Sequence, residues 1–227
     1  MSKLSIVIPV FNERDTLESV IQAVEQSTAF GLAKEIIIVD DFSTDGTREV
    51  ISNLKIKISN LKVLLNEKNM GKGFSVRIGL AEATGDFVII QDADLEYDPN
   101  EYVNLLTPLI SGVPVVYGSR FLGKPFIWKT YFLANKFLTT LSNLFTGLHL
   151  TDMETCYKCF NRNALQVILP QLTANRFDIE PEITQVVARC GLSVSEVPIS
   201  YFRRSYAQGK KIGLKDGLQA IWTIIMK

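Results

Sequence analysis

Short apolar segments recur along the first 120 residues of the chain, with helical patterns between them. In chain order they read LSIVIPV, EIIIVD, KVLLN, DFVIIQD and PVVYGS. Their Ile and Val residues do not alternate with polar ones, which is typical of strands buried on both faces, and the intervening helices indicate parallel βαβ units. The pattern therefore predicts an α/β fold with a Rossmann-like, mostly parallel sheet flanked by helices.

The pattern changes after Gly118 and becomes mostly helical. Apolar residues spaced by four, three and four predict an amphipathic helix over residues 126–148, and these are Phe137, Leu141, Leu144 and Leu148. A helix over Glu180–Cys190, a strand in LSVSEVPISYF and a helix from Leu214 complete the chain. No repeat or low-complexity linker divides the 227 residues, so we expect a single domain.

Charge is balanced overall but not along the chain. Lys and Arg number 24 and Asp and Glu number 24, which gives no argument for nucleic acid as a partner. From Tyr102 to Thr151 there is no acidic residue, although Arg120, Lys124, Lys129 and Lys136 lie within that stretch. Pro and Gly interrupt its longest uncharged part, so we expect no membrane-spanning helix.

Cysteine use indicates a reducing compartment. Cys156, Cys159 and Cys190 are an odd number and do not resemble a secreted disulfide framework. Cys156 and Cys159 form a C-x-x-C motif, but no second ligand pair accompanies it, so a redox or zinc site is not favoured. The first apolar run is too short for a signal sequence. We therefore expect a cytoplasmic protein.

Polar clusters follow the predicted strands, at residues 9–13, 40–46, 69–73 and 92–96. Ligands of parallel α/β sheets bind outside the carboxyl ends of the strands, so the four clusters are expected to line one crevice. Acidic residues alternate in the last cluster and beyond it, at Asp92, Asp94, Glu96 and Asp98. Closely spaced carboxylates suit a divalent cation, and the alternative is a solvated strand end.

Two further clusters allow both a structural and a ligand-binding interpretation. In VDDFSTDGT, Asp40, Asp41 and Asp45 either form a βα turn or bind a nucleobase or ribose. NMGKGFS places glycines and Lys72 ahead of a helix, as a phosphate site does, but it matches neither the ATPase nor the dinucleotide fingerprint. Basic residues in GSRF and YFRRSYAQGKK are solvated unless phosphates lie near them.

Taken together, six motifs resemble the family 2 glycosyltransferases of GT-A fold, most closely the dolichol- and polyprenyl-phosphate sugar synthases. In chain order they are VIPVFNE, IIIVDDFSTDGT, GDFVIIQDADLEYDP, YGSRF, TDMETCYK and EVPISYFRRSYAQGKK. The resemblance covers nearly the whole chain. It implies a nucleotide-sugar-binding half over about residues 1–120 and an acceptor-binding half over about residues 121–227.

The resemblance also implies where the nucleotide lies. Pro9, Phe11 and Glu13 would border the nucleotide, and Val39 and Asp41 would lie at its base and ribose.

Asp92 and Asp94 resemble the family's motif for Mg²⁺ or Mn²⁺ and the diphosphate, and Ala93 would contact the nucleotide through its backbone. Some members carry a glutamine as a further metal ligand two residues on. Here Glu96 stands in that place, and it either binds the metal or lies behind its ligands.

Basic residues would hold the phosphates. Arg120 resembles the family's phosphate-binding arginine, and Arg204 with Lys210 resembles the pair that closes over donor diphosphate and acceptor phosphate. The reaction implied is inverting transfer of a hexose, with GDP-mannose favoured as donor and a UDP sugar a close second. Asp94, Arg120 and Arg204 would act directly on the reacting groups.

The acceptor decides whether the enzyme needs a base. A polyprenyl phosphate is already an anion and needs none, whereas an alcohol acceptor would require one, with Asp152 as the first candidate and Glu154 as another. His149, the only histidine, is expected in a structural role. A nucleotidyltransferase and a non-catalytic subunit are the remaining alternatives.

A polyprenyl-phosphate acceptor implies peripheral contact with the cytoplasmic face of a membrane. The helix over residues 126–148 could lie in the interface, with Lys129 and Lys136 meeting anionic headgroups. Packing of its apolar stripe on the sheet or on a second subunit is the alternative, which leaves a homo-oligomer open.

Overall fold

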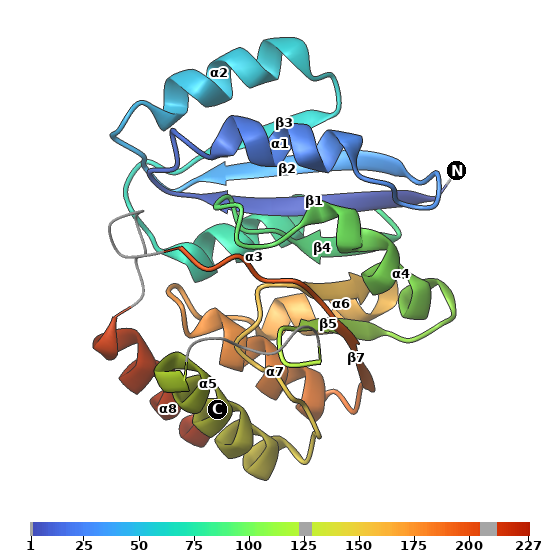
Figure 1. Ribbon diagram of the computed structural model, residues 1–227, viewed down its shortest axis with the longest axis vertical. Coiled ribbons are helices and arrows are strands. Elements are labelled where there is room, and N and C mark those ends of the chain that lie inside the picture. The colour runs from blue at the N-terminus through green and yellow to red at the C-terminus, as the bar shows by residue number, and fades with distance from the viewer. Residues whose placement is uncertain (1, 123–128, 205–212) are drawn as a thin grey trace.

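The computed structural model describes residues 2–122, 129–204 and 213–227, and within them the chain forms a seven-stranded sheet flanked by helices (Figure 1). The strand order is β3-β2-β1-β4-β6-β5-β7. The strands are β1 (Lys3–Val10), β2 (Ala33–Asp40), β3 (Leu61–Leu65), β4 (Phe87–Ile90), β5 (Val115–Ser119), β6 (Lys158–Asn161) and β7 (Val194–Pro198). Each of the five apolar segments of the first 120 residues forms a strand, as predicted, and so does the segment before Tyr201.

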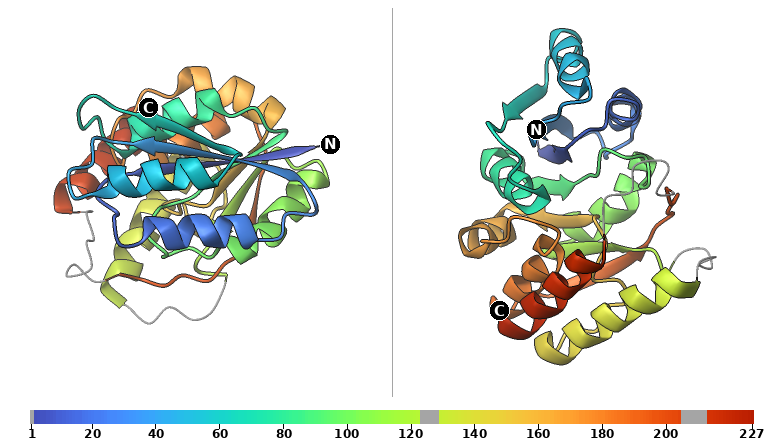
Figure 2. Two further views of the ribbon diagram at one scale, coloured as in Figure 1. Left: turned by 90° about the horizontal axis from the view of Figure 1, so that it is seen from above. Right: turned by 90° about the vertical axis from the view of Figure 1, so that its left-hand side faces the viewer.

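The helices follow the strands in βα order through the first half of the chain. They are α1 (Leu17–Gln26), α2 (Thr47–Lys57), α3 (Lys72–Glu82), α4 (Tyr102–Ile110), α5 (Lys129–Thr146), α6 (Arg162–Ile168), α7 (Ile179–Arg189) and α8 (Leu214–Met226), with short 3₁₀ turns η1 (Pro99–Glu101) and η2 (Leu169–Gln171). Figure 2 shows α1 and α4 on one face of the sheet and α3 and α6 on the other. Helices α5, α7 and α8 pack against one another beside the β5–β7 end of the sheet (Figure 1).

Parallel pairing dominates the sheet and explains its apolar strands. In the middle of the sheet Val7 of β1 pairs with Ile37 of β2 on one side and with Ile90 of β4 on the other. All three side chains are at most 1% exposed, because helices cover both faces. The fold is therefore the α/β fold that the sequence predicted.

Strand β6 was not predicted, and it joins the two halves of the chain. It lies between β4 and β5 and runs antiparallel to both. Its four residues are KCFN, and Lys158 is completely buried. The C-x-x-C motif therefore places Cys156 just before a strand and Cys159 within it, both buried. One sheet thus contains strands from before and after residue 120.

Helix α5 was predicted, but its buried face differs from the predicted stripe. The predicted start at residues 126–128 lies outside the described residues. Phe137 is 58% exposed and Leu144 is 78% exposed, although both were expected to belong to one apolar stripe with Leu141. The buried positions are Leu138, Thr139 and Ser142 instead, because α5 packs on α7 and α8. None of the helices in the described ranges is long and apolar enough to cross a membrane.

Candidate active site

A cavity of about 870 Å³ lies at the carboxyl ends of β1, β2 and β4. Its other wall is formed by α5 and α8, through Ala134 and Gly217 among others. Ten of the predicted site residues line it, namely Pro9, Phe11, Glu13, Asp41, Asp92, Ala93, Asp94, Glu96, Arg120 and Arg204. Val39 and Asp152 do not line it, and Lys210 lies outside the described residues.

Asp92 is held by a lysine that the sequence analysis had assigned to a phosphate loop. Lys72 Nζ lies 2.8 Å from Asp92 Oδ1 and 3.1 Å from a carboxylate oxygen of Glu180. Burial alone would raise the pKa of Asp92, but the ammonium of Lys72 outweighs it and lowers that pKa. Glu180 also binds the buried Lys158 at 2.6 Å. Acidic and basic groups therefore alternate along the floor of the cavity.

The glycines of NMGKGFS serve close packing. A Cβ on Gly71 would lie 2.3 Å from the carbonyl oxygen of Asn175, and one on Gly73 would lie 2.7 Å from that of Ala174. Contacts this short do not occur, so only glycine lets the segment at 174–176 cross the start of α3. Phe74 N donates to the same Asn175 oxygen, at 3.1 Å. Packing therefore accounts for the glycines, while Asn69, Gly71 and Lys72 line the cavity and a phosphate contact of this segment stays a prediction.

Asp94 lies opposite Arg204. Arg204 Nη2 donates to Asp94 Oδ2 at 2.9 Å, and the same guanidinium binds both carboxylate oxygens of Glu13, at 2.9 and 3.1 Å. Burial, reinforced by the nearby charges of Asp92 and Glu96, raises the pKa of Asp94 to about 7. The guanidinium of Arg204 thus supplies positive charge beside the carboxylates of Glu13 and Asp94.

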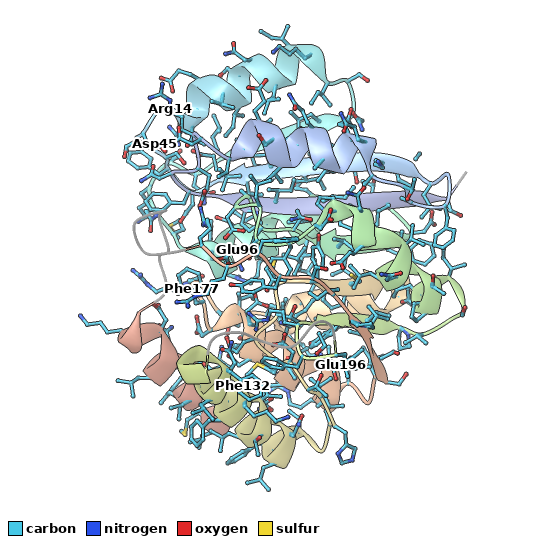
Figure 3. All side chains as sticks on the ribbon, in the orientation of Figure 1. Arg14, Asp45, Glu96, Phe132, Phe177 and Glu196 are labelled. Atoms are coloured by element: carbon cyan, nitrogen blue, oxygen red, sulfur yellow. The ribbon has the colours of Figure 1, made fainter. Side chains whose placement is uncertain are left out.

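Glu96 anchors the segment that follows β7. Its Oε1 accepts from Arg204 N at 2.7 Å, its Oε2 accepts from Tyr201 Oη at 2.7 Å, and its carbonyl oxygen accepts from Phe202 N at 2.9 Å. Figure 3 labels Glu96 beside this segment. Both carboxylate oxygens of Glu96 are therefore engaged in holding Arg204 near Asp94.

Asp152 forms a buried ion pair with Arg120. Its Oδ2 and Oδ1 accept from Nε and Nη2 of Arg120 at 2.6 Å each, and Oδ2 also accepts from the backbone N of Arg120 at 3.0 Å. Burial would lower the pKa of Arg120, but Asp152 reverses this and raises it well above its usual value. With both oxygens bound and no access to the cavity, Asp152 is placed as an anchor for Arg120, which differs from the base role considered for it.

The residues assigned to base and ribose have different surroundings. Asp41 lines the cavity, and its carboxylate accepts from Met70 N at 2.7 Å and Gly71 N at 2.8 Å, which fixes the loop before α3. Val39 is completely buried in β2, close to Gly79 of α3. Contact with the nucleotide stays a prediction for both residues.

The site contains two groups that sequence reasoning did not assign, Lys158 and Glu180. With Lys72 they belong to one ion-pair network, but the three residues lie on three separate elements. Glu180 was taken only as the start of a helix. The sequence signal for Glu180 was an acidic side chain in the first turn of α7. A favourable interaction with the helix dipole explains such a side chain equally well.

Asp92 and Asp94 carry oxygen ligands of the kind that divalent cations bind. In the ranges that the structure describes, no three His, Cys, Asp or Glu side chains converge on one point. Asp92 and Asp94 both line the cavity, and each faces the cationic end of a side chain, Lys72 or Arg204. Oxygen ligands of this kind suit Mg²⁺ and Mn²⁺, and the pKa of Asp94 is raised first by burial and then by the negative charges of Asp92 and Glu96, which a cation would offset.

The fold is a mostly parallel α/β sheet with a ligand-sized cavity at the carboxyl ends of its strands. The model of the family described as Glycosyl transferase family 2 matches residues 5–169, and the chain belongs to this family. It is a glycosyltransferase, and its fold is GT-A, as predicted.

Two relatives indicate which members it is similar to. A UDP-N-acetylglucosamine–dolichyl-phosphate N-acetylglucosaminyltransferase from Methanococcus voltae is 26% identical over 97% of this chain and 94% of its own length. A dolichol-phosphate mannosyltransferase from Pyrococcus furiosus is 35% identical over 57% of this chain, a match that spans only 37% of that protein.

Solved structures show the same fold. Glucosyl-3-phosphoglycerate synthase from Mycobacterium tuberculosis, in complex with Mn²⁺, UDP and glucosyl-3-phosphoglycerate, is similar with a TM-score of 0.74 and 22% identity. The match covers 99% of this chain and 79% of that one. The same enzyme was also solved with Mg²⁺ and UDP, with a TM-score of 0.73.

Proposed function

We propose that this chain transfers a hexose from a nucleotide sugar to a polyprenyl phosphate, with inversion at the anomeric carbon. The proposal rests on two kinds of group that line one cavity. These are the carboxylates of Asp92 and Asp94, and the guanidinium of Arg120, which Asp152 holds in an ion pair. The carboxylates suit a metal-bound diphosphate, and the guanidinium suits a second phosphate. Two anion sites in one chamber are what transfer to a phosphate requires.

The donor diphosphate lies over Asp92 and Asp94 in this proposal. Mg²⁺ or Mn²⁺ held by these two aspartates would supply positive charge to the departing diphosphate. Arg204 leaves its contacts with Asp94 and Glu13 and binds the diphosphate, since a guanidinium forms bidentate bonds with phosphate oxygens. Glu96 keeps the backbone of Arg204 in reach throughout.

Arg120 orients the acceptor phosphate. A phosphate oxygen attacks the anomeric carbon from the face opposite the diphosphate, a new carbon–oxygen bond forms, and the bond to the nucleotide breaks with its electron pair. A phosphate monoester is ionised near neutral pH, so no side chain needs to remove a proton. This agrees with the geometry of Asp152, whose oxygens are both bound to Arg120.

The donor is a UDP or a GDP sugar. The sequence favoured GDP-mannose, with a UDP sugar a close second. The relative that matches along almost the whole chain is named for UDP-N-acetylglucosamine, and this supports the UDP alternative more strongly than the partial match supports mannose. UDP-N-acetylglucosamine and GDP-mannose are accordingly the first two donors to test.

Helices α5 and α8 form the side of the enzyme that meets the cytoplasmic face of a membrane. Each carries large apolar side chains in solvent, Leu133 and Phe137 on α5 and Leu218 and Trp222 on α8, all more than half exposed. Both helices also wall the cavity. A lipid acceptor can therefore leave its chain in the bilayer while its phosphate reaches Arg120, and the exposed Lys136 adds attraction to anionic headgroups.

A donor-binding experiment tests the proposal before any lipid is added. Thermal shift with a panel of sugar nucleotides, with and without Mn²⁺, should show stabilisation by one base and sugar that depends on the metal. Asp94→Asn should abolish the metal-dependent part. If no sugar nucleotide stabilises the protein in the presence of Mn²⁺ or Mg²⁺, the proposed donor site is wrong.

A further inference from the structure

Glu154 lines the cavity, and one of its carboxyl oxygens has no partner. Oε1 of Glu154 is inaccessible to solvent and has no hydrogen-bond partner among the described residues. A buried polar atom that makes no hydrogen bond costs about 1–3 kcal/mol, and more when it carries charge. A fold that only needed to fill this position could use an apolar side chain, so an incompletely bonded carboxyl group in the cavity wall points to a ligand.

Two ion pairs act on the charge of Glu154, and neither provides its partner. In the first pair, Lys158 Nζ donates to Met153 O, Thr155 O and Glu180 Oε2, at 2.9, 2.5 and 2.6 Å. An ammonium has three donors, so none is left for Glu154.

In the second pair, Nε and Nη2 of Arg120 bind Asp152. Burial raises the pKa of Glu154 to about 7, with the charge of Lys158 opposing the shift and that of Glu180 adding to it. The charges of Arg120 and Asp152 act on Glu154 as well, and with opposite signs. The charges of both ion pairs thus act on the carboxyl, and neither pair hydrogen-bonds it.

Glu154 lines the cavity and is within electrostatic reach of two ion pairs that belong to different anion sites. The Lys158–Glu180 pair continues through Lys72 to Asp92, which belongs to the donor side. The Arg120–Asp152 pair belongs to the acceptor side. The transferred hexose must bridge the donor diphosphate and the acceptor phosphate, so its ring passes Glu154.

We propose that Glu154 hydrogen-bonds a hydroxyl of the transferred hexose and thereby helps to select the sugar. The inference rests on the proposed donor site, and it assigns the residue a binding role rather than the base role. A sugar hydroxyl both donates and accepts, so it satisfies the carboxyl in either protonation state.

The test separates sugar binding from nucleotide binding. Calorimetry with UDP-N-acetylglucosamine, GDP-mannose, UDP and GDP in Mn²⁺ measures how much affinity the sugar adds to each nucleotide. We expect Glu154→Ala and the size-matched Glu154→Met to lose about ten-fold in affinity for the productive donor and to bind the free nucleotide like the wild type. Glu154→Gln, which keeps one donor and one acceptor, should stay within about three-fold of the wild type.

Thr155→Val is the matched control. Thr155 Oγ1 is also buried without a partner, but Thr155 does not line the cavity. Its replacement should leave the sugar's contribution unchanged.

Three outcomes overturn the inference. Equal losses for the sugar nucleotide and the free nucleotide would make Glu154 a structural residue. Unchanged sugar affinity in both apolar variants would exclude contact with the hexose. A fall in turnover of 10²–10⁴-fold for Glu154→Gln with sugar affinity intact would make it a base. If the wild type binds nucleotides without any gain from the sugar, the proposed donor site fails first, which is a separate result.

Discussion

Both oxygens of Asp152 bind the guanidinium of Arg120, at 2.6 Å each, and Asp152 has no exposed surface. The backbone N atoms of Thr151 and Asp152 are in turn held by Glu196, at 2.7 and 3.0 Å. Asp152 does not line the cavity, and both of its oxygens hold Arg120. We therefore predict that it positions Arg120 and does not act as the base that an alcohol acceptor would need.

A double-mutant cycle tests the role of Asp152. We expect Asp152→Asn to raise the KM for the acceptor and to destabilise the fold by about 3–5 kcal/mol, because it leaves the buried Arg120 without its counter-ion. In an Arg120→Ala background, the loss of Asp152 should add little to the loss of transfer, since it acts only through Arg120. Steady-state kinetics and urea unfolding measure the two effects.

If the losses of transfer caused by the Asp152 and Arg120 substitutions multiply in the double variant, this account is contradicted. If Asp152→Asn lowers turnover by 10²–10⁴-fold in both backgrounds, Asp152 removes a proton and the acceptor is an alcohol.

Metal binding should depend on Asp94 more than on Glu96. Asp94→Asn should remove detectable Mn²⁺ binding and abolish transfer, while the protein stays folded. Glu96→Gln should weaken Mn²⁺ binding by less than about three-fold, because Glu96 bonds Tyr201 and the backbone of Arg204 and a Gln oxygen can still accept one of these bonds. Titration of Mn²⁺ by calorimetry decides. Equal losses in the two variants would make Glu96 a metal ligand.

The raised pKa of Glu154 predicts a pH-dependent gain of stability in Glu154→Gln. Because the pKa of Glu154 is higher in the folded state, the folded state binds the proton more tightly than the unfolded chain does. Protonated Glu154 therefore contributes stability, and this contribution is fully present below the ordinary pKa near 4.5. That contribution is lost as pH rises toward the folded value of about 7. The Tm advantage of Glu154→Gln should therefore grow between about pH 4.5 and 7 and level off above. A constant difference across this range would contradict the assignment.

Membrane contact should depend on exposed residues of α5 and α8. We expect the wild type to float with anionic vesicles at low salt, and Phe137→Ser with Trp222→Ser to float less. Lys136→Glu should weaken flotation more at low salt than at high salt, because charge attraction to headgroups is screened. Ile56→Ser is the control, since Ile56 is 85% exposed on α2, which does not wall the cavity. If the double variant floats like the wild type and the protein is a dimer, these faces bind a second copy instead.

The strands and the cavity-lining carboxylates could be predicted because they depend on local pattern. Continuous Ile and Val runs mark β1, β2 and β4, and polar residues at their ends have to meet at one edge of a parallel sheet. Asp92 and Asp94 were found in this way.

Features that depend on distant partners could not be predicted. Lys158 is the first residue of the four-residue strand β6, and its burial is possible only because Glu180, on α7, neutralises it. Lys72 follows a glycine like a phosphate-binding residue, and only the position of Asp92 shows its ion pair. The orientation of α5 depends likewise on its packing against α7 and α8, which exposed part of the predicted stripe.

Transfer to a phosphate in preference to the matching alcohol is the central claim. The direct measurement incubates the enzyme and Mn²⁺ with UDP-N-acetylglucosamine or GDP-mannose and either a short-chain polyprenyl phosphate or the polyprenol of the same length. The account predicts a polyprenyl-phosphate sugar of inverted anomeric configuration, its loss on chelation of the metal, and no transfer to the polyprenol. Glycosylation of the polyprenol at a similar or higher rate, or transfer that survives chelation, would contradict it.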